Sequence, residues 1–206
     1  LCLGYKSNSV IEYFIKENKK KIFITFRSKD LIQFKYKSKN LNFNAALVFT
    51  GIKSGTGGRI AIAYKKLKLD EDFLMTYGDG LSNLSIKNLI KFHYKNKSDV
   101  TLTAVRPKQR YGVLGINKNR VKAIDNSKEK KVDIYINGGF FIISKKMIDK
   151  IKSNKMFWEN EPLNFAIKKK KLFAYKHEGF WKSLDTLKDK NDFNELMKKK
   201  NTPWIN

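Results

Sequence analysis

Two kinds of apolar pattern alternate along this chain. Continuous or every-second apolar positions predict strands, and apolar positions that recur every three or four residues predict helices. The predicted strands are Leu1–Tyr5, Lys21–Phe26, Asn42–Phe49, Asp72–Tyr77, Val100–Ala104, Val113–Ile116, Val121–Ile124, Tyr135–Ile143 and Leu172–Tyr175. The predicted helices are Val10–Phe14, Ile60–Leu67, Ile86–His93, Lys145–Ile151 with Ser144 as its N-cap, Pro162–Ala166 and Thr186–Lys199.

Strands that alternate with helices are typical of an α/β fold whose sheet is covered on both faces. A chain of 206 residues fits a single domain spanning residues 1–206. The chain opens on the all-apolar strand Leu1–Tyr5. Such a strand normally has neighbours on both edges, so we expect that a preceding segment of the domain is missing.

The formal net charge is +25, and the excess consists mainly of lysine distributed along the whole chain. There is no arginine-rich arm and no RNP-type aromatic motif, so the charge favours small polyanions such as nucleotides and sugar phosphates over nucleic acid. The single cysteine, Cys2, excludes an internal disulfide and favours a reducing, cytoplasmic setting. No apolar run is long enough to predict a membrane-spanning helix.

Two aspartates lie where ligand chemistry is expected. Asp79 follows the apolar strand Asp72–Tyr77 in the sequence Gly78-Asp79-Gly80, and ligands bind at the carboxyl ends of strands in open α/β sheets. A tight turn is the alternative explanation for Asp79. Asp185 precedes the last predicted helix, where it is either a helix cap or an oxygen ligand for a hard cation such as Mg²⁺.

Two glycine-rich stretches also have two explanations each. Thr56-Gly57-Gly58-Arg59 offers unobstructed backbone N–H groups beside an arginine, which suits a phosphate or a nucleotide edge, and a flexible hairpin is the alternative. Asn137-Gly138-Gly139 interrupts a predicted buried strand, which indicates either close approach of a ligand or a β-bulge.

The histidines and two of the tryptophans are predicted to be structural. His93 and His177 have no metal-ligand spacing to one another or to Cys2. Trp158 and Trp181 are expected in the core or in a pocket wall. No Ser-His-Asp order and no nucleophile elbow is present, so the sequence does not indicate a hydrolase of that kind.

Read in order, five segments resemble the glucose-1-phosphate cytidylyltransferase family of sugar nucleotidyltransferases, and the resemblance covers nearly the whole chain. It implies a Rossmann-like nucleotidyltransferase fold with a mixed, mostly parallel central sheet that lacks its N-terminal nucleotide-binding segment. It also implies that residues 159–206 form a C-terminal α/β portion of the sugar site. The segments are 56–59 (TGGR), 77–80 (YGDG), 136–141 (INGGFF), 158–163 (WENEPL) and 179–190 (GFWKSLDTLKDK).

The resemblance implies transfer of a cytidylyl group from CTP to glucose 1-phosphate, giving CDP-glucose and pyrophosphate. Asp79 and Asp185 match the two magnesium-binding aspartates of the family, and Lys130 is the equivalent of its catalytic lysine near the sugar phosphate. The family has Pro after this lysine, whereas this chain has Lys131. The substrate-binding positions implied by the resemblance are Ser54, Thr56, Gly57, Gly58, Arg59, Gly78, Glu129, Asn137, Gly138 and Glu161.

The family opens on a glycine-rich loop with Gly-Thr-Arg and a later Lys-Pro, which holds the triphosphate and the base. No part of this sequence matches that loop. Transfer from UTP, dTTP or GTP therefore remains an alternative, as does an inactive fragment that binds sugar phosphates or partner proteins. We expect this chain alone to be inactive and poorly stable, and the full-length enzyme to form homo-oligomers whose product serves polysaccharide biosynthesis.

Overall fold

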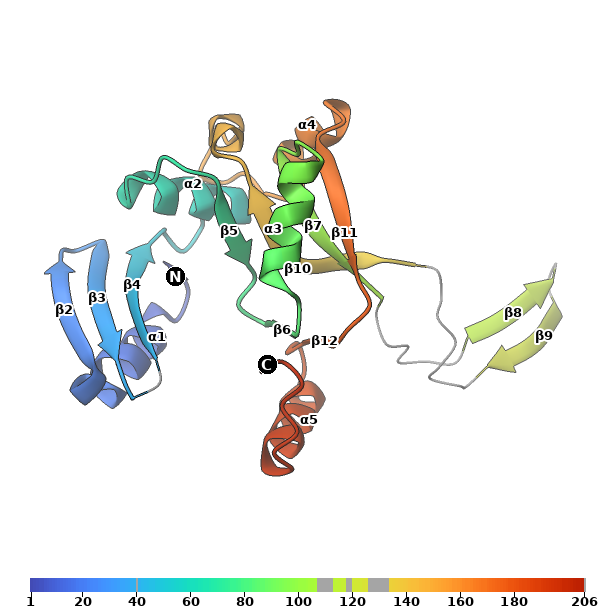
Figure 1. Ribbon diagram of the computed structural model, residues 1–206, viewed down its shortest axis with the longest axis horizontal. Helices are drawn as coiled ribbons and strands as arrows, with labels where there is room; N and C mark the ends of the chain where they lie inside the picture. Colours follow the sequence, from blue (N-terminus) through green and yellow to red (C-terminus); the bar gives the residue numbers. More distant parts are fainter. Residues whose placement is uncertain (40, 107–112, 118–119, 126–133, 206) are drawn as a thin grey trace. The chain divides into compact units, whose positions relative to one another are not determined.

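The computed structural model describes residues 1–39, 41–106, 113–117, 120–125 and 134–205 (Figure 1). The chain divides into two compact units, each built from two separate segments. The first unit comprises Leu1–Asp72 and Ser144–Lys171, and the second comprises Phe73–Ile143 and Leu172–Asn206. The stretch 159–206, expected to form one portion of the fold, is therefore divided between the units.

The first unit contains a four-stranded sheet in the order β1-β4-β3-β2. These strands are β1 (Cys2–Leu3), β2 (Ile22–Arg27), β3 (Leu31–Lys37) and β4 (Asn42–Phe49). β1 and β4 are parallel, and the other neighbours are antiparallel. β3 is a strand that the sequence analysis did not predict, although Ile32, Phe34 and Tyr36 alternate with polar residues in the pattern of a half-buried strand.

A helical segment covers one face of this sheet. α1 (Ser7–Ile11) continues as a π-helix over Glu12–Glu17 and ends in a short 3₁₀ helix, Lys19–Lys21. The predicted helix over Val10–Phe14 is therefore confirmed, but it is longer than expected. The side chains of this segment that pack against the buried cluster of Leu3, Ile32, Phe34 and Leu47 are Val10, Ile11, Phe14 and Ile15.

α2 (Thr56–Lys66) begins at Thr56 rather than at the predicted Ile60. Its first turn contains the glycines that the sequence analysis assigned to a loop. α2 lies against β1, β4 and the 3₁₀ helix η3 (Lys145–Lys150), which also contacts α4 (Glu161–Lys168). These elements complete the first unit.

Ser144 occupies the predicted N-cap position of η3, but its side chain does not cap the helix. The Ser144 side chain accepts no capping hydrogen bond and instead donates to Oδ1 of Asp72 at 3.0 Å. The same Asp72 oxygen accepts the backbone N–H of Lys145 at 2.8 Å. An aspartate distant in sequence therefore satisfies the first N–H of this helix, which a local pattern could not indicate.

The second unit contains a four-stranded sheet in the order β11-β7-β10-β5. The strands are β5 (Phe73–Thr76), β7 (Val100–Val105), β10 (Ile136–Ile143) and β11 (Leu172–His177). β10 is antiparallel to β5 and β7, and β11 is parallel to β7. The carboxyl ends of β5, β7 and β11 therefore meet at one edge, called here the carboxyl edge.

The predicted α/β architecture with a mixed sheet is confirmed, but its strand pairing differs in one respect. In each four-stranded sheet one neighbouring pair is parallel and two are antiparallel, so parallel pairs do not predominate. The physical reason in the second unit is β10, a buried apolar strand that runs against both of its neighbours.

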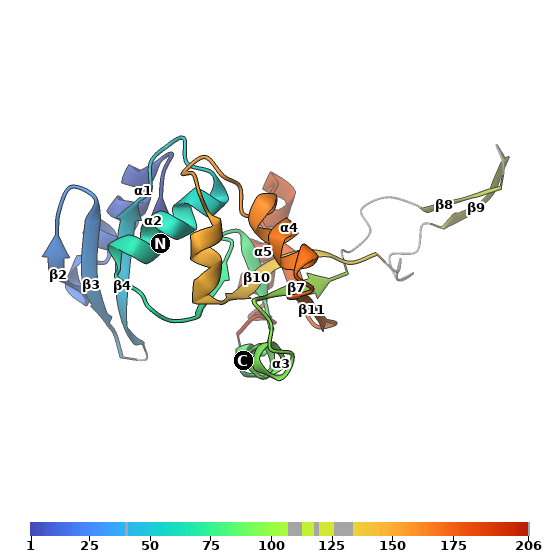
Figure 2. The ribbon, with the colours of Figure 1, turned by 90° about the horizontal axis from the view of Figure 1, so that it is seen from above.

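α3 (Ile86–Lys95) covers one face of this second sheet, where it packs on β7, β10 and β11 (Figure 2). Leu89 of α3 is fully buried in a cluster with Leu84 and Ile142. His93 is also buried, and its Nδ1 lies 2.8 Å from the hydroxyl of Thr101. The predicted structural role of His93 is confirmed.

Shorter elements complete the second unit. β6 (Gly80–Ser82) and β12 (Trp181–Ser183), neither of them predicted, form an antiparallel pair called here the ribbon. The predicted pairing of two short strands is confirmed by β8 (Val113–Asn117) and β9 (Arg120–Asp125). The chain then forms α5 (Leu187–Lys198). Within the described ranges, every helix is too short or too polar to span a bilayer.

Candidate active site

Asp79 lies in the turn that joins β5 to β6, at the carboxyl edge of the second sheet. The backbone N–H of Tyr77 donates to the carbonyl of Gly139 at 2.9 Å and fixes the start of this turn. Asp79 and the preceding Gly78 are both exposed. A Cβ built on Gly78 would meet no atom within 4 Å, so the fold itself does not require glycine there. The open space lies beside an accessible carboxylate.

The ribbon brings Asp185 to the same place. Ser183 pairs with Gly80, and the next rung is the hydrogen bond from the Leu184 N–H to the Asp79 carbonyl at 2.8 Å. Asp185 is the residue immediately beyond this rung, and it is exposed. Its Oδ2 accepts the hydroxyl of Ser183 at 2.6 Å. Two aspartates far apart in sequence therefore lie on adjacent chain segments.

Asp185 is not the cap of the last helix. Thr186 is the N-cap of α5, and its hydroxyl accepts the N–H of Asp189 at 3.2 Å. Asp189 in turn accepts the N–H of Thr186 at 3.0 Å, which completes a capping box. The structure therefore excludes the cap explanation for Asp185 and leaves its carboxylate available for another role.

The two aspartates fit a magnesium ion of the kind that binds with phosphates. Mg²⁺ at such sites is typically held by one or two carboxylates, with water and substrate phosphates as its other ligands. In the part of the chain that the structure describes, no group of three or more His, Cys, Asp or Glu side chains could hold a metal.

The ribbon is anchored to its surroundings through β12. The Trp181 indole N–H donates to the Gly138 carbonyl of β10 at 2.8 Å, so this tryptophan supports the ribbon. Lys182 forms ion pairs with Asp192 and with the buried Asp189 of α5. The hydrogen bond from Lys182 holds the pKa of Asp192 below its ordinary value. These contacts connect the Asp79–Asp185 region to both the sheet and α5.

For Asn137-Gly138-Gly139 the structure favours the β-bulge. The register between β10 and β7 shifts after Asn137, and Gly139 has a φ of +77°, a conformation that suits glycine. The Asn137 Oδ1 accepts the N–H of Gly139 at 2.9 Å. A Cβ on Gly138 would lie 2.9 Å from Cγ1 of Val105. Packing and the bulge therefore explain both glycines without a ligand.

The Gly57-Gly58 stretch of the first unit also has a structural explanation. Both glycines are buried in the first turn of α2, against the backbone of residues 154–158. A Cβ on Gly58 would overlap the carbonyl group of Asn154, and the Gly58 N–H donates to the Met156 carbonyl at 3.1 Å. The stretch is therefore not a hairpin, and the N–H of Gly58 is already engaged within the protein.

Arg59 and Ser54 contact the chain itself. The Arg59 guanidinium donates to the Leu3 carbonyl at 3.2 Å, the Thr50 hydroxyl at 2.8 Å and the Ile52 carbonyl at 3.2 Å. The Ser54 hydroxyl donates to the Thr50 carbonyl. In this structure both side chains hold the segment that follows β4.

Thr56 and Glu161 are the first residues of two helices of the first unit, α2 and α4. The Thr56 hydroxyl donates to Oε2 of Glu159 at 2.6 Å and accepts the N–H of Trp158 at 2.8 Å. Trp158 is fully buried, which confirms its predicted core position. Glu161 is exposed as the first residue of α4.

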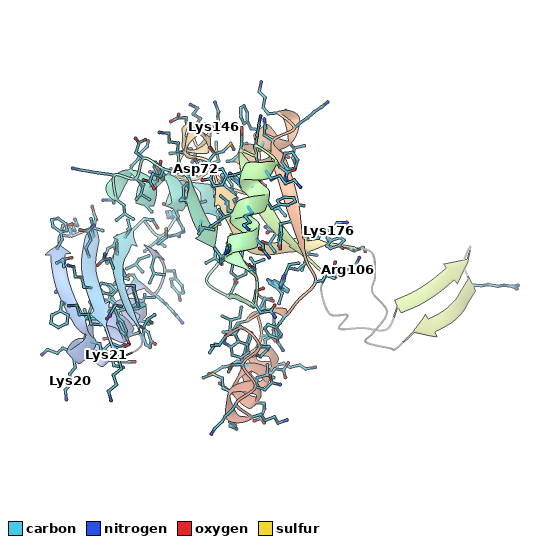
Figure 3. The ribbon with its side chains drawn as sticks, viewed as in Figure 1. Lys20, Lys21, Asp72, Arg106, Lys146 and Lys176 are labelled. Atoms are coloured by element: carbon cyan, nitrogen blue, oxygen red, sulfur yellow. The ribbon has the colours of Figure 1, made fainter. Side chains whose placement is uncertain are left out.

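The carboxyl edge also carries charged residues that the sequence analysis did not single out. Arg106 follows β7, and Lys176 lies near the end of β11; Figure 3 shows them close to one another. Each cation lies 4.8 Å from the ring centre of Tyr135, and the Tyr135 hydroxyl donates to Oε1 of Glu178 at 2.9 Å. Only strand order could have revealed this grouping. The predicted Glu129 and Lys130 lie outside the described residues.

Comparison with known proteins places these features in context. The family model described as nucleotidyl transferase matches residues 5–198. The chain is 37% identical over 204 residues to the glucose-1-phosphate cytidylyltransferase of Salmonella typhimurium, covering 99% of this chain and 79% of that protein. It is 32% identical over 205 residues to the probable glucose-1-phosphate cytidylyltransferase of Bacillus subtilis, with the same coverage.

Solved structures show a similar fold. The crystal structure of HddC from Yersinia pseudotuberculosis matches with a TM-score of 0.60 at 25% identity. The match covers 96% of this chain and 77% of that chain. The likeness thus extends across nearly all of the present sequence.

Proposed function

Because this chain belongs to the nucleotidyl transferase family, and within it to the glucose-1-phosphate cytidylyltransferases, we propose that it makes CDP-glucose. The reaction transfers a cytidylyl group from CTP to glucose 1-phosphate and releases pyrophosphate. The observation that carries the proposal is the hydrogen bond between Leu184 and Asp79, which joins the segments of the two exposed aspartates.

The chemistry is an in-line displacement at phosphorus. A phosphate oxygen of glucose 1-phosphate attacks the α-phosphorus of CTP, and the bond from that phosphorus to the oxygen bridging to the β-phosphate breaks. The electron pair leaves with pyrophosphate, so no oxidant or other co-reactant is needed. Positioning of the two anionic substrates and neutralisation of their charge supply most of the catalysis in such reactions.

In this proposal Asp79 and Asp185 hold Mg²⁺. When bound, the ion supplies positive charge to the phosphate oxygens. Both carboxylates are exposed and can therefore be reached by a bound nucleotide. The space beside Gly78 supports the proposal that the nucleotide approaches the backbone there, since no protein atom lies within 4 Å of a Cβ built on it.

The remaining substrate contacts follow from the family resemblance. Lys130 would hold the sugar phosphate, with Glu129 beside it, and Ser54, Arg59 and Glu161 would contact substrate. Of these, Arg59 would have to serve a ligand while its guanidinium also donates to the Leu3 and Ile52 carbonyls. The net charge of +25 would assist capture of both anionic substrates.

The proposal extends to the setting of the enzyme. We place the reaction in the cytoplasm, where CTP and Mg²⁺ are present, and expect the full-length enzyme to form a homo-oligomer. CDP-glucose would then serve polysaccharide biosynthesis.

The test is a product assay with the purified chain. CTP, glucose 1-phosphate and Mg²⁺ are incubated with the protein, and CDP-glucose and pyrophosphate are quantified by anion-exchange chromatography and ³¹P NMR. The proposed function predicts both products in equal amounts, and none when EDTA removes the metal; turnover by this chain would overturn the sequence-based expectation that it is inactive alone. Parallel reactions contain UTP, dTTP or GTP in place of CTP. Product formation with one of these but not with CTP would replace the cytidylyl assignment, and no product with any would indicate an inactive chain.

A further inference from the structure

The Phe180 carbonyl is a point where three donors converge in the second unit. It accepts the N–H of Asn83 at 3.1 Å and the hydroxyl of Ser82 at 2.9 Å. Nε2 of His177 lies 3.1 Å from the same carbonyl oxygen. His177 ends β11, Ser82 ends β6 and Phe180 directly precedes β12. The carbonyl therefore joins the ribbon to the end of a sheet strand.

The contacts of Nε2 define which ring nitrogen of His177 carries the hydrogen. Ser82 Oγ donates to the Phe180 carbonyl and accepts the N–H of Leu84 at 3.1 Å. Nε2 of His177 also lies 3.1 Å from Ser82 Oγ, whose own proton is already directed at the carbonyl. Because both neighbours of Nε2 offer acceptor oxygens, this nitrogen carries the hydrogen and donates it. His177 therefore acts as a hydrogen-bond donor to the ribbon.

The ribbon needs such an anchor. Its two strands each contain three residues, and an isolated two-stranded pair is marginally stable at best. Its rungs run from Asn83–Phe180 at one end to Asp79–Leu184 at the other. A slip of one residue would exchange the two faces of a strand and move Asp185 away from the rung it now follows. Whatever fixes one end therefore fixes the aspartates at the other.

We propose that His177 is a positioning residue for the metal-binding aspartates. It sets the register of β12 against β6 through Ser82 and the Phe180 carbonyl, and thereby places Asp185 beside Asp79. This inference rests on the proposed function, because it assumes that the two aspartates share a cation. His177 itself contacts the end of the ribbon opposite the Asp79–Leu184 rung, so its role is to position the aspartates.

The packing of Gly179 supports this role independently. A Cβ on Gly179 would overlap Oδ1 of Asn83 and lie 2.7 Å from Cε1 of His177. The φ of Gly179 is not in the left-handed region, so alanine is excluded there by contact rather than by backbone strain. The turn between β11 and β12 is thus packed directly against the imidazole, and Gly179→Ala should displace the same contacts as loss of the ring.

The experiment measures cation affinity directly. Mn²⁺ replaces Mg²⁺ as the probe, and free Mn²⁺ is followed by its EPR signal in a titration of the full chain without nucleotide, because CTP would itself bind the ion and remove its signal. We expect His177→Ala and Gly179→Ala to weaken Mn²⁺ binding about tenfold, the loss typical when groups that orient metal ligands are removed. His177→Gln retains a donor near the position of Nε2 and should restore most of the affinity.

The matched control is His93→Gln in the same unit. His93 is a buried, hydrogen-bonded histidine on α3, so its loss should lower the melting temperature without changing the Mn²⁺ affinity of the folded protein. Wild-type affinity in both alanine variants, or an equal loss in His93→Gln, would overturn the positioning role. If the wild-type chain itself bound no Mn²⁺ while Asp79→Asn behaved identically, the metal assignment of the proposed function would fail and the inference would fall with it.

Discussion

Two glycine-rich turns of this protein have similar sequences and opposite surroundings. At Gly55–Gly58, the protein fills the space that side chains would occupy: a Cβ on Gly55 or Gly58 would overlap a backbone carbonyl of residues 154–156. At Gly78–Gly80, a Cβ on Gly78 would meet nothing within 4 Å, and one on Gly80 would have only ordinary contacts at 3.8 Å. Glycine density alone therefore does not indicate a ligand site, because the same residue type can be required by packing or can leave open space beside it.

The charged residues of the two turns differ in the same way. In the first turn, the Arg59 guanidinium is bound to backbone carbonyls of Leu3 and Ile52. In the second, the carboxylate of Asp79 is exposed, and the segment of Asp185 lies next to it. The first turn uses its polar groups to hold the fold, and the second leaves them accessible for chemistry.

The largest expected effect comes from removing the charge in the second turn. Asp79→Asn should lower CDP-glucose formation about a thousandfold, because a carboxylate that holds a cation at the phosphates contributes several kcal/mol to transition-state stabilisation. The melting temperature should stay within a few degrees of wild type, since Asp79 is exposed. The measurement is the initial rate under saturating substrates. Retained turnover would remove Asp79 from the metal site.

The second largest effect is on the free energy of unfolding, and it concerns the Gly55–Gly58 stretch. Gly58→Ala should destabilise the protein by about 3 kcal/mol, because the added methyl group must displace the Asn154 backbone. Urea unfolding followed by circular dichroism measures this loss. Gly57→Ala is the graded control, since its Cβ would lie 3.0 Å from the Met156 carbonyl and requires a smaller shift. A Gly58→Ala protein as stable as wild type would contradict the packing explanation.

Unlike Gly58→Ala, Gly78→Ala should affect substrate binding rather than stability. Its unfolding free energy should be unchanged or rise by about 0.5 kcal/mol, because the position has room and the unfolded chain loses freedom. The KM for CTP should nevertheless increase about tenfold if the nucleotide approaches this backbone. Steady-state kinetics and a thermal melt distinguish the two quantities. An unchanged KM would show that the space beside Gly78 is not used.

The smallest expected effect is a loss of stability in Thr186→Ala. It distinguishes the role of Thr186, which caps α5, from the role of Asp185. Thr186→Ala should cost about 1 kcal/mol of stability, because it removes the hydroxyl that caps α5, with little effect on kcat. Asp185→Asn should leave stability unchanged and lower the rate. Thermal melts of both variants, run beside the product assay, give the comparison. A large loss of stability in Asp185→Asn would return that residue to a structural role.

Much of the fold could be predicted from local pattern. The strands β5, β7, β10 and β11 and the helices α3 and α5 follow from apolar periodicity, and Asp79 was placed at a strand end by the same means. β6 and β12 were missed because each has only three residues and no apolar periodicity of its own. Yet these two strands bring Asp185 beside the Asp79 segment.

The sequence by itself determined the alternation of strands and helices, the family resemblance and the candidate aspartates, because these depend on residues close together in the chain. Only the tertiary structure decided which glycines are packed and which lie beside open space, and that Thr186 rather than Asp185 caps α5. It also decided that His177 reaches the ribbon, where Ser82 and Phe180 meet although they are 98 residues apart. The reason is physical: the free space around an atom and the partner of a donor are set by segments that local periodicity does not specify.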